Sequence, residues 1–510
     1  MNALFPLETA LPEGILLSAL LVFLFLGVVS IANLFLRTGS RYAVPATIHV
    51  AAGVLATLAQ DLMTLLIAWE VLTFSAFILI RGRGTARGRL LSLRYLTMQL
   101  IAAVFFFFAT LVHYREVGSL SVGLLVSTAQ PFMVVAVLIK TATVPVHFWL
   151  VEAYPSVDPA VTPLLSVFTT KIGVITAAQV IRISPAGYPV LAWIGAGTAV
   201  VAVVYALAQH NARRLLSFHI VSQVGYMVAG IGLAALSAVP PASILPGGIS
   251  PATTAGVFHL ITHTLYKALL LLVAAQAIYT WGHEDLTRMG GLGFKRPVLL
   301  LCGIIGAAAI SGVPFTSGYA SKYLLKEAAG AQPLVAYLLN IASVGTGLSF
   351  IKFTYLVFFN CGAGGRRDEP CETSQEASPT GKTRFTAMVP VVLIAAVTVV
   401  IGVVPQAVPG VPSREYFAPA SVVSAMLPLV GSVLLWAVLR KRLTMPGTGE
   451  IPAVGGTEGL PMLPLTRWFF RATRHLRLPA RIIHEQGPQV QVLLTLVVLV
   501  AAAWLLGAIQ

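Results

Sequence analysis

DLMTLLIAWEVLTFSAFILI, at residues 61–80, is an almost unbroken run of apolar side chains with one glutamate, Glu70, near its centre. A helix of about twenty apolar residues is long enough to cross the hydrocarbon core of a membrane, which is about 30 Å thick. A carboxylate at that depth is costly, so Glu70 needs a partner, water or a function. The segment therefore predicts a membrane-spanning helix with a charge at its centre.

The same pattern runs through most of the chain. Of the 510 residues, 57% are hydrophobic and only 10% are charged, whereas about 25% of the residues of soluble domains are charged. The apolar residues come in runs of about 20, while the strands of an outer-membrane barrel would alternate apolar and polar residues. We therefore predict an all-α polytopic membrane protein.

We predict about fourteen transmembrane helices, each about 20 residues long. They lie near residues 14–36, 43–60, 61–81, 91–113, 131–151, 160–183, 188–208, 215–236, 253–280, 297–316, 334–360, 386–405, 418–439 and 490–508. The loops between them alternate between arginine-rich and nearly uncharged, as the positive-inside rule expects when no helix has been missed. The stretch 141–160 departs from this rule, since it holds Glu152 and Asp158 but no arginine or lysine.

The first apolar run follows the acidic residues Glu8 and Glu13 rather than a basic segment, so we expect a membrane helix and not a cleaved signal peptide. Counting helices from this start places the arginine-rich loops in the cytoplasm and both termini outside. We expect the inner membrane of a bacterium or an archaeon.

The composition argues against several functions. The net charge of +15 comes largely from arginines in short loops, which topology explains, so we expect no nucleic-acid partner. The cysteines Cys302, Cys361 and Cys371 form no pair with the spacing of a zinc or iron–sulfur site. We expect no cofactor, no metal and no catalytic centre in this chain.

Two segments are too polar to cross a membrane. Residues 361–384 form a polar loop, and residues 441–489 begin with a Pro/Gly linker. The second segment continues as LTRWFFRATRHLRLPARIIHEQ, in which arginines recur at helical spacing with aromatic residues between them. This pattern suits a helix in the membrane interface or on a partner, and equally a basic connector held by anionic lipid.

Further ionisable residues lie in the middle third of predicted helices. Besides Glu70 they are Lys140, Lys171, His263, Lys267 and Lys352. At 1.5 Å per residue, Glu70 and Lys140 fall at equal depth, so the two side chains can pair. Static ion pairs between helices would explain any one of these lysines, but charges at similar depth on five helices favour lateral proton movement.

Pro145 follows Lys140 by five residues in KTATVPVHFWL and cannot donate a helical hydrogen bond, so the helix should break beside the lysine. Broken helices at mid-membrane are the usual construction of ion sites, although proline kinks without a function are common too. Next to a buried lysine, the break favours an ion site.

In GVFHLITHTLYKALLLL the residues His259, His263 and Lys267 recur every four residues and share one helix face. Histidine titrates near neutral pH and can relay protons in both directions. A metal site and hydrogen-bonded packing histidines are the alternatives, and the helix has no carboxylate to complete a metal site.

Six segments, taken in order, resemble the antiporter-like subunits of respiratory complex I, Mrp-type sodium/proton antiporters and membrane-bound hydrogenases. They are DLMTLLIAWEVLTFSAFILI, VLIKTATVPVHFWLVEAYP, TTKIGVITAAQVIR, NARRLLSFHIVSQVGYMVAG, FHLITHTLYKALLLL and GVPFTSGYASK. The resemblance runs from about residue 45 to 360. The third segment looks most like the D subunit of Mrp antiporters and the middle antiporter-like subunit of complex I.

The resemblance implies two inverted five-helix repeats, each with one broken helix. The repeats would span residues 61–236 and 237–440, after N-terminal helices at 1–60 and before the basic segment 441–489 and a last helix at 490–510. Compared with the family, the first helices look shortened.

The resemblance also implies roles for the charged residues. Glu70 would match the family's helix glutamate, Lys140 its lysine partner on the broken helix, and Lys171 the next lysine inward. His263 with Lys267 would form the central link. Lys352 would end the path, although no proline interrupts residues 334–360.

The implied function is an ion-translocating subunit of a multisubunit membrane complex, which moves H⁺ or exchanges Na⁺ for H⁺. Its partners would be other membrane subunits and, in a redox pump, subunits with flavin and iron–sulfur clusters. Two other functions stay open. The chain could serve ion-driven uptake of a small solute such as inorganic carbon, or act as a scaffold whose charges only hold helices together.

Overall fold

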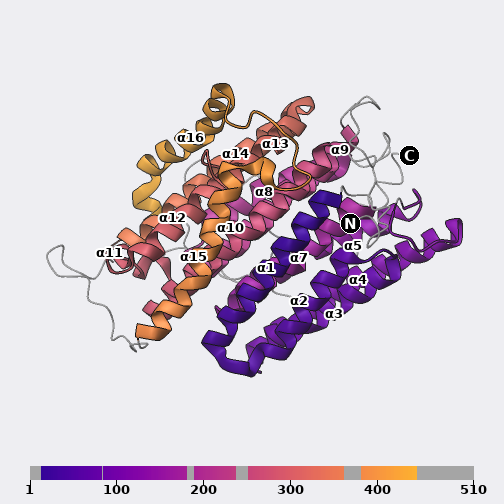
Figure 1. Cartoon of the computed structure of the whole chain (residues 1–510), viewed down its shortest axis with the longest axis horizontal. Coiled ribbons are helices and arrows are strands. Elements are labelled where there is room, and N and C mark those ends of the chain that lie inside the picture. The colour runs from indigo at the N-terminus through magenta and orange to yellow at the C-terminus, as the bar shows by residue number, and fades with distance from the viewer. Residues whose placement is uncertain are drawn as a thin grey trace, which may run out of the picture.

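The computed structural model describes residues 13–180 apart from Arg83 and Leu124, residues 189–236, 251–360 and 381–444 (Figure 1). Within these ranges the regular elements are helices, and β-structure is limited to two isolated bridges. The prediction of an all-α polytopic protein is confirmed. The last predicted helix at 490–508 and most of the segments 361–384 and 441–489 lie outside the described residues.

The helices follow one another along the chain, and most of them are long. They are α1 Glu13–Thr38, α2 Ala43–Leu58, α3 Leu62–Arg81, α4 Ala86–Val117, α5 Gln130–Lys140, α6 Phe148–Ala153, α7 Val161–Val180, α8 Pro189–Leu207, α9 Ala212–Leu236, α10 Pro251–Trp281, α11 Leu292–Lys295, α12 Pro297–Ser311, α13 Ser317–Ala328, α14 Pro333–Thr354, α15 Gly381–Val403 and α16 Pro419–Thr444. In the described residues, nine helical stretches are long and apolar enough to cross a membrane.

Two predicted helices differ from the structure in an informative way. The predicted helix at 131–151 is helical only in α5 and α6. The predicted helix at 297–316 ends earlier, as α12 at Ser311, and a separate short helix, α13, follows beyond the predicted range. α13 was not predicted because its twelve residues include Lys322, Lys326 and Glu327 and form no long apolar run. The polar loop predicted at 361–384 is also shorter, since α15 begins at Gly381.

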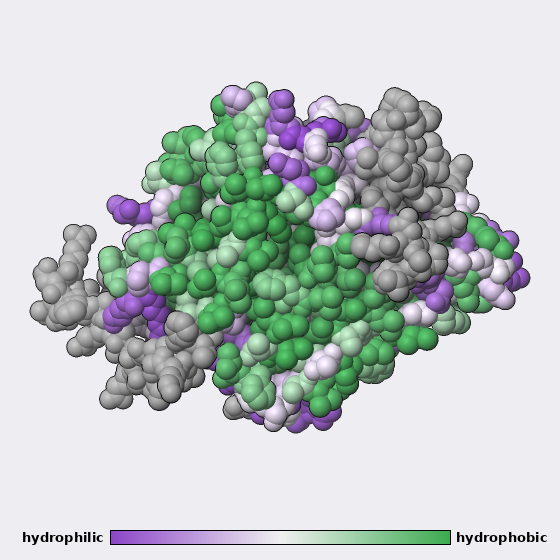
Figure 2. Space-filling view, in the orientation of Figure 1, coloured by the Kyte–Doolittle hydropathy of each residue, from purple (hydrophilic) through white to green (hydrophobic). Residues whose placement is uncertain are grey.

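α7 and α10 form the centre of the bundle. The most apolar 18-residue window of each is fully buried, whereas that of α16 is only 11% buried. Figure 1 shows α1 to α4 on one side of this centre and α12, α14 and α16 on the other. Figure 2 shows a broad apolar belt across the middle of the molecule, with hydrophilic residues gathered toward the ends of the helices, as a lipid-facing surface requires.

α8 and α9 pack at close backbone distance because glycines lie between them. A methyl group at Gly195 would lie 2.3 Å from the backbone nitrogen of Ala229, and one at Gly225 would lie 2.6 Å from that of Ala199. Small residues four apart on each helix are the usual means of close helix packing in membranes. The two helices therefore pack closely, without large side chains between them at these positions.

The two acids of the stretch that departs from the arginine pattern contact residues of other helices. Glu152 forms an ion pair with Arg94 at 3.1 Å. The Tyr279 hydroxyl donates to Asp158 at 2.6 Å, and the guanidinium of Arg37 lies over the ring of Tyr279 at 4.7 Å. These acids thus share one end of the bundle with arginine-rich loops, which we call the arginine face.

Candidate ion path

The helix that carries Lys140 is broken directly after this residue. α5 ends at Lys140, and Pro145 lies in the non-helical stretch before α6. Such a break leaves carbonyl groups at the end of α5 without helical partners. The indole of Trp149 donates to the carbonyl of Ile139 at 3.0 Å, so the structure satisfies part of this end and leaves the lysine at the tip of a half-helix.

Lys140 faces α3. Its ammonium is fully buried, donates to the hydroxyl of Thr73 at 3.0 Å and lies over the ring of Trp69 at 4.7 Å. Glu70 lies on the same helix, between these two residues in sequence, and its charge acts on Lys140. Within the described residues the two form no ion pair of 4.0 Å or less, and one carboxylate oxygen of Glu70 has no hydrogen-bond partner. The expected pair is therefore near but separated.

Lys171 comes next, toward the centre of the bundle. It is fully buried on α7, and its ammonium donates to the Thr170 hydroxyl at 3.3 Å. A methyl group at Gly173 would lie 3.1 Å from the Cγ atom of Lys140, so this glycine lets the stem of Lys140 pack against α7. The charge of Lys171 acts on both His263 and Lys267 of α10.

The three basic residues of α10 share a face but differ in their contacts. His259 is held on both sides, at 2.9 Å from the hydroxyl of Ser321 and 3.2 Å from the amide oxygen of Gln223. His263 and Lys267 are fully buried, and their side-chain nitrogens have no hydrogen-bond partner among the residues that the structure describes. His259 is thus anchored, while the other two are left to interact through water or by moving.

His219 on α9 extends this group and was not selected from the sequence. It is fully buried, and neither ring nitrogen has a partner in the described part of the chain. Its ring lies 4.7 Å from that of Phe350, over which the ammonium of Lys267 also lies, at 5.9 Å. The charges of Lys267 and Lys322 both act on His219. A histidine inside the apolar part of a helix was the signal that could have found it.

A second broken helix, α12 followed by α13, carries Lys322. α12 ends at Ser311, and Gly312 takes the left-handed backbone conformation with φ of 81°, which a glycine adopts without strain. The ammonium of Lys322 donates at 2.8 Å to the carbonyl of Ile310 in the last turn of α12. Only 5% of Lys322 is exposed. The lysine therefore binds the negative end of a half-helix dipole.

Lys322 was also missed in the sequence, although a signal was present. The break that precedes it contains Val313 and Pro314, the same dipeptide that occurs at residues 144–145 in the first break. The segment GVPFTSGYASK ends at Lys322 itself. Four helices, α7 to α10, and the short α11 separate the two broken segments, so these segments run in opposite directions if each long helix crosses once.

Lys352 contacts the end of a neighbouring helix. It lies on α14, which is continuous and ends in a π-helical turn, Tyr355–Phe359. Its ammonium donates to the carbonyls of Leu207 at 3.0 Å and Gln209 at 2.7 Å, at the end of α8. From the sequence, Lys352 is expected to end the path at mid-membrane, and the structure shows its ammonium bound at the end of α8. Its contacts are those of a helix cap.

His49 on α2 is a further buried histidine beside Lys140. Its Nδ1 atom lies 2.9 Å from the hydroxyl of Ser75, which itself donates to the carbonyl of Leu72. Because the hydroxyl has only one proton, Nδ1 is the donor and Nε2 keeps a free lone pair. Nε2 has no partner among the described residues, so His49 could accept a proton there.

No three His, Cys, Asp or Glu side chains gather into a metal-binding group in the part of the chain that the structure describes. The partners of His259 are a serine hydroxyl and an amide. This arrangement favours the hydrogen-bonded or proton-relay interpretation of the α10 histidines.

The chain is similar to a subunit of an antiporter and to a component of a hydrogenase over about two thirds of its length. It is 28% identical to the D subunit of the Na⁺/H⁺ antiporter of Alkalihalophilus pseudofirmus, over 68% of this chain and 69% of that protein. It is 27% identical to hydrogenase-4 component B of Escherichia coli, over 66% of this chain but only 52% of that protein.

Solved structures show the same fold. A chain of the Mrp complex from a Dietzia species superposes with a TM-score of 0.67 at 23% identity, covering 84% of this chain and 86% of that one. A chain of respiratory complex I from Thermus thermophilus superposes with a TM-score of 0.61, also at 23% identity, covering 78% of this chain and 85% of that one.

The model of the family described as NADH:quinone oxidoreductase/Mrp antiporter, transmembrane, matches residues 59–349, which is more than half of the chain. The range contains both broken helices and every buried lysine of the site except Lys352. The resemblance read from the sequence motifs is thereby confirmed, and the chain belongs to this family.

Proposed function

We propose that this chain translocates protons as a membrane subunit of a larger complex, along a line from Glu70 through Lys140 and Lys171 to α10 and Lys322. The observation that carries the proposal is the succession of buried basic groups across the bundle. The charge of Glu70 acts on Lys140, that of Lys171 acts on His263 and Lys267, and those of Lys267 and Lys322 act on His219. Lys140 reaches the helix of Lys171 by packing, since its stem lies against Gly173 on α7. A static scaffold would instead pair these charges, because an unpaired buried charge is costly.

The arrangement supports protons as the moving ion. Ammonium and imidazole groups exchange protons but do not bind hard cations, which prefer oxygen ligands. His263, Lys267 and His219 have nitrogens without protein partners in the described residues, so water or side-chain rotation can link them. Exchange of protons for sodium would need an oxygen-lined site elsewhere in the complex.

The two broken helices would carry the first and the last lysine of the path. Lys140 and Lys322 each lie at or beside the C-terminal end of a half-helix. In this proposal Lys322 takes the terminal role first expected for Lys352, whose ammonium caps α8. His219 bridges the gap between Lys267 and Lys322.

We place the arginine face in the cytoplasm. Arg37, Arg94 and Arg213 lie at this end of the bundle, in agreement with the positive-inside rule. Single cysteines introduced at Lys295 and at Ser119 should be labelled from opposite sides of an inner membrane. Labelling of both from one side would contradict this orientation.

The partners in the proposal are other membrane subunits. The solved relatives belong to an Mrp complex and to respiratory complex I. Purification of the native complex followed by mass spectrometry of its chains would show which kind of complex this subunit joins. Flavin or iron–sulfur subunits would indicate a redox pump, and small hydrophobic chains an antiporter.

The central test is Lys140→Ala in the native complex, reconstituted in vesicles. Proton flux should be abolished while the complex still assembles, because the path loses the lysine that follows Glu70. Lys295→Ala is the control, since Lys295 is an exposed lysine on α11. Normal flux in an assembled Lys140→Ala complex would contradict the proposed function.

A further inference from the structure

A cavity of about 400 Å³ lies between α13, α14 and α16 and reaches Lys322. Its lining is polar for a membrane protein. It includes two lysines, two tyrosines and four serines, namely Lys322, Lys326, Tyr319, Tyr323, Ser311, Ser343, Ser421 and Ser424. Cavities of this size commonly hold a small ligand.

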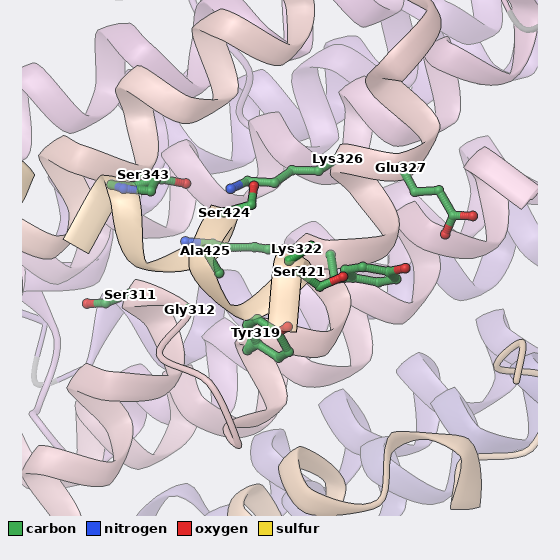
Figure 3. A pocket seen from close by; sticks show the side chains of 13 residues that line it. Ser311, Gly312, Tyr319, Lys322, Lys326, Glu327, Ser343, Ser421, Ser424 and Ala425 are labelled. Carbon is green, nitrogen blue, oxygen red and sulfur yellow. The ribbon is translucent and has the colours of Figure 1, made fainter. Parts of the chain in front are cut away.

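The charge in this cavity is positive and largely unpaired. Lys322 and Lys326 are four residues apart and therefore share one face of α13. Figure 3 shows both side chains extended in the same direction, while Glu327 points away from them. Glu327, the one carboxylate of the lining, forms an ion pair with Arg414 at 3.2 Å. Lys326 has no hydrogen bond or ion pair with another described residue.

Several donors remain for a ligand. The ammonium of Lys322 has three protons, and the carbonyl of Ile310 accepts one of them. Ser421 and Ser424 bring hydroxyls from the opposite wall, on α16. In Figure 3 the amino end of Lys326 extends toward Ser424. Lysine is a usual binder of phosphate, whose oxygens accept hydrogen bonds from such a set.

The position of the cavity favours a lipid as the source of the phosphate. Lys326 and Ser421 lie near the ends of their helices that are opposite the arginine face. On α16, beside the cavity, Val423 and Leu427 are 63% and 68% exposed, as expected of side chains that contact acyl chains. A headgroup at this level could enter the cavity while its chains lie along α16.

We propose that this cavity binds the phosphate of an anionic phospholipid headgroup between Lys322 and Lys326. The bound phosphodiester, with its single negative charge, compensates part of the charge of the two ammonium groups. A further consequence rests on the proposed function. Because Lys322 ends the proton path, an anionic headgroup stabilises a proton on this lysine, and the lipid composition of the membrane then sets the rate of proton transfer.

Binding can be measured by native mass spectrometry of the intact complex, delipidated in detergent and then supplied with phosphatidylglycerol or phosphatidylcholine. The complex should retain phosphatidylglycerol in preference, since the choline cation of the second lipid is repelled by the lysines. Lys326→Gln should weaken retention roughly tenfold or more, as loss of a charge-assisted hydrogen bond predicts. Lys326→Arg should keep it.

Lys295→Gln is the matched control, because it removes one positive charge from an exposed site on α11. The proposed site would be refuted if wild type and Lys326→Gln retained phosphatidylglycerol equally. It would also be refuted if Lys326→Gln and Lys295→Gln lost phosphatidylglycerol to the same extent. Inorganic phosphate forms the second arm. If it binds with dependence on Lys326 while phosphatidylglycerol does not, the lipid headgroup is the wrong ligand.

The link to transport needs a separate readout. Lys140→Ala should abolish proton flux and keep lipid retention, so failure of the path and failure of the site are distinguishable. In vesicles, wild-type flux should rise with the phosphatidylglycerol content, and Lys326→Gln should remove this dependence. Flux that is independent of phosphatidylglycerol would overturn the link to transport.

Discussion

The ammonium of Lys140 donates its hydrogen bond to the hydroxyl of Thr73, at 3.0 Å, and not to the carboxylate of Glu70. Both Lys140 and Thr73 are fully buried. The hydroxyl holds the lysine at the end of α5 while Glu70, three residues before Thr73 on α3, acts on it from farther away. A small movement of α3 relative to α5 would exchange one partner for the other.

Thr73→Val should reduce proton flux about tenfold, because valine has nearly the same shape but leaves the ammonium without its hydrogen bond, which for a charged group is worth roughly 1.5–3 kcal/mol. Thr73→Ser keeps the hydroxyl and should keep the flux. Flux would be measured in vesicles with the native complex. Equal rates in the valine and serine variants would show that the hydroxyl has no part in transport.

Lys322→Ala should abolish proton flux. Lys352→Ala should leave proton flux unchanged in every complex that still assembles. The reason is that Lys322 lies at a helix break beside His219, while the Lys352 ammonium binds the carbonyls of Leu207 and Gln209. Flux per assembled complex is the measurement. The opposite result, with flux lost only in Lys352→Ala, would restore the role expected from the sequence.

Much of the fold and the first half of the site could be predicted from the sequence because their signals are local. Apolar runs of about 20 residues show the long helices, and a charge within such a run is conspicuous. Lys140 with Pro145 and the α10 group at His259, His263 and Lys267 were found in this way.

The second half of the site was harder because its signals are short or depend on packing. α13 has only twelve residues and a charged end, so it does not stand out as an apolar run in the sequence. Lys322, which lies on this helix, was therefore not selected as a site residue. Lys352 looked like a mid-membrane charge by counting residues. Only the contact with the end of α8 shows where its long side chain reaches.

Gly225→Ala should destabilise the protein by about 1–3 kcal/mol, the usual cost of overpacking. The added methyl would lie 2.6 Å from both the backbone nitrogen of Ala199 and the backbone oxygen of Gly195, so α8 and α9 must separate. Gly197→Ala is the control, since a methyl there would meet nothing within 4 Å. Thermal unfolding in detergent is the measurement, and equal melting temperatures for both variants would refute the close packing.

His210 lies in the loop between α8 and α9 and should make the free energy of unfolding depend on pH in the acidic range. Burial, and next the charge of Lys352, lower the pKa of His210 from 6.5 to about 4, while Asp285 opposes this shift. Above pH 6.5 the imidazole is neutral in both the folded and the unfolded chain, so it has no effect on the free energy of unfolding. As the pH falls from 6.5 to 4, only the unfolded chain binds the proton, and stability decreases by about 3 kcal/mol in total.

His210→Gln should therefore flatten the loss of stability between pH 6.5 and 4 without changing the proton path. Lys352→Met removes the neighbouring positive charge, so the pKa of His210 in the folded protein should rise. The pH range over which stability decreases should then end at a higher pH. The measurement is the slope of melting temperature against pH. Loss of the contact between Lys352 and the end of α8 would lower the melting temperature equally at every pH, so it would not change this slope. An unchanged slope in His210→Gln would show that His210 does not stay neutral in the folded protein.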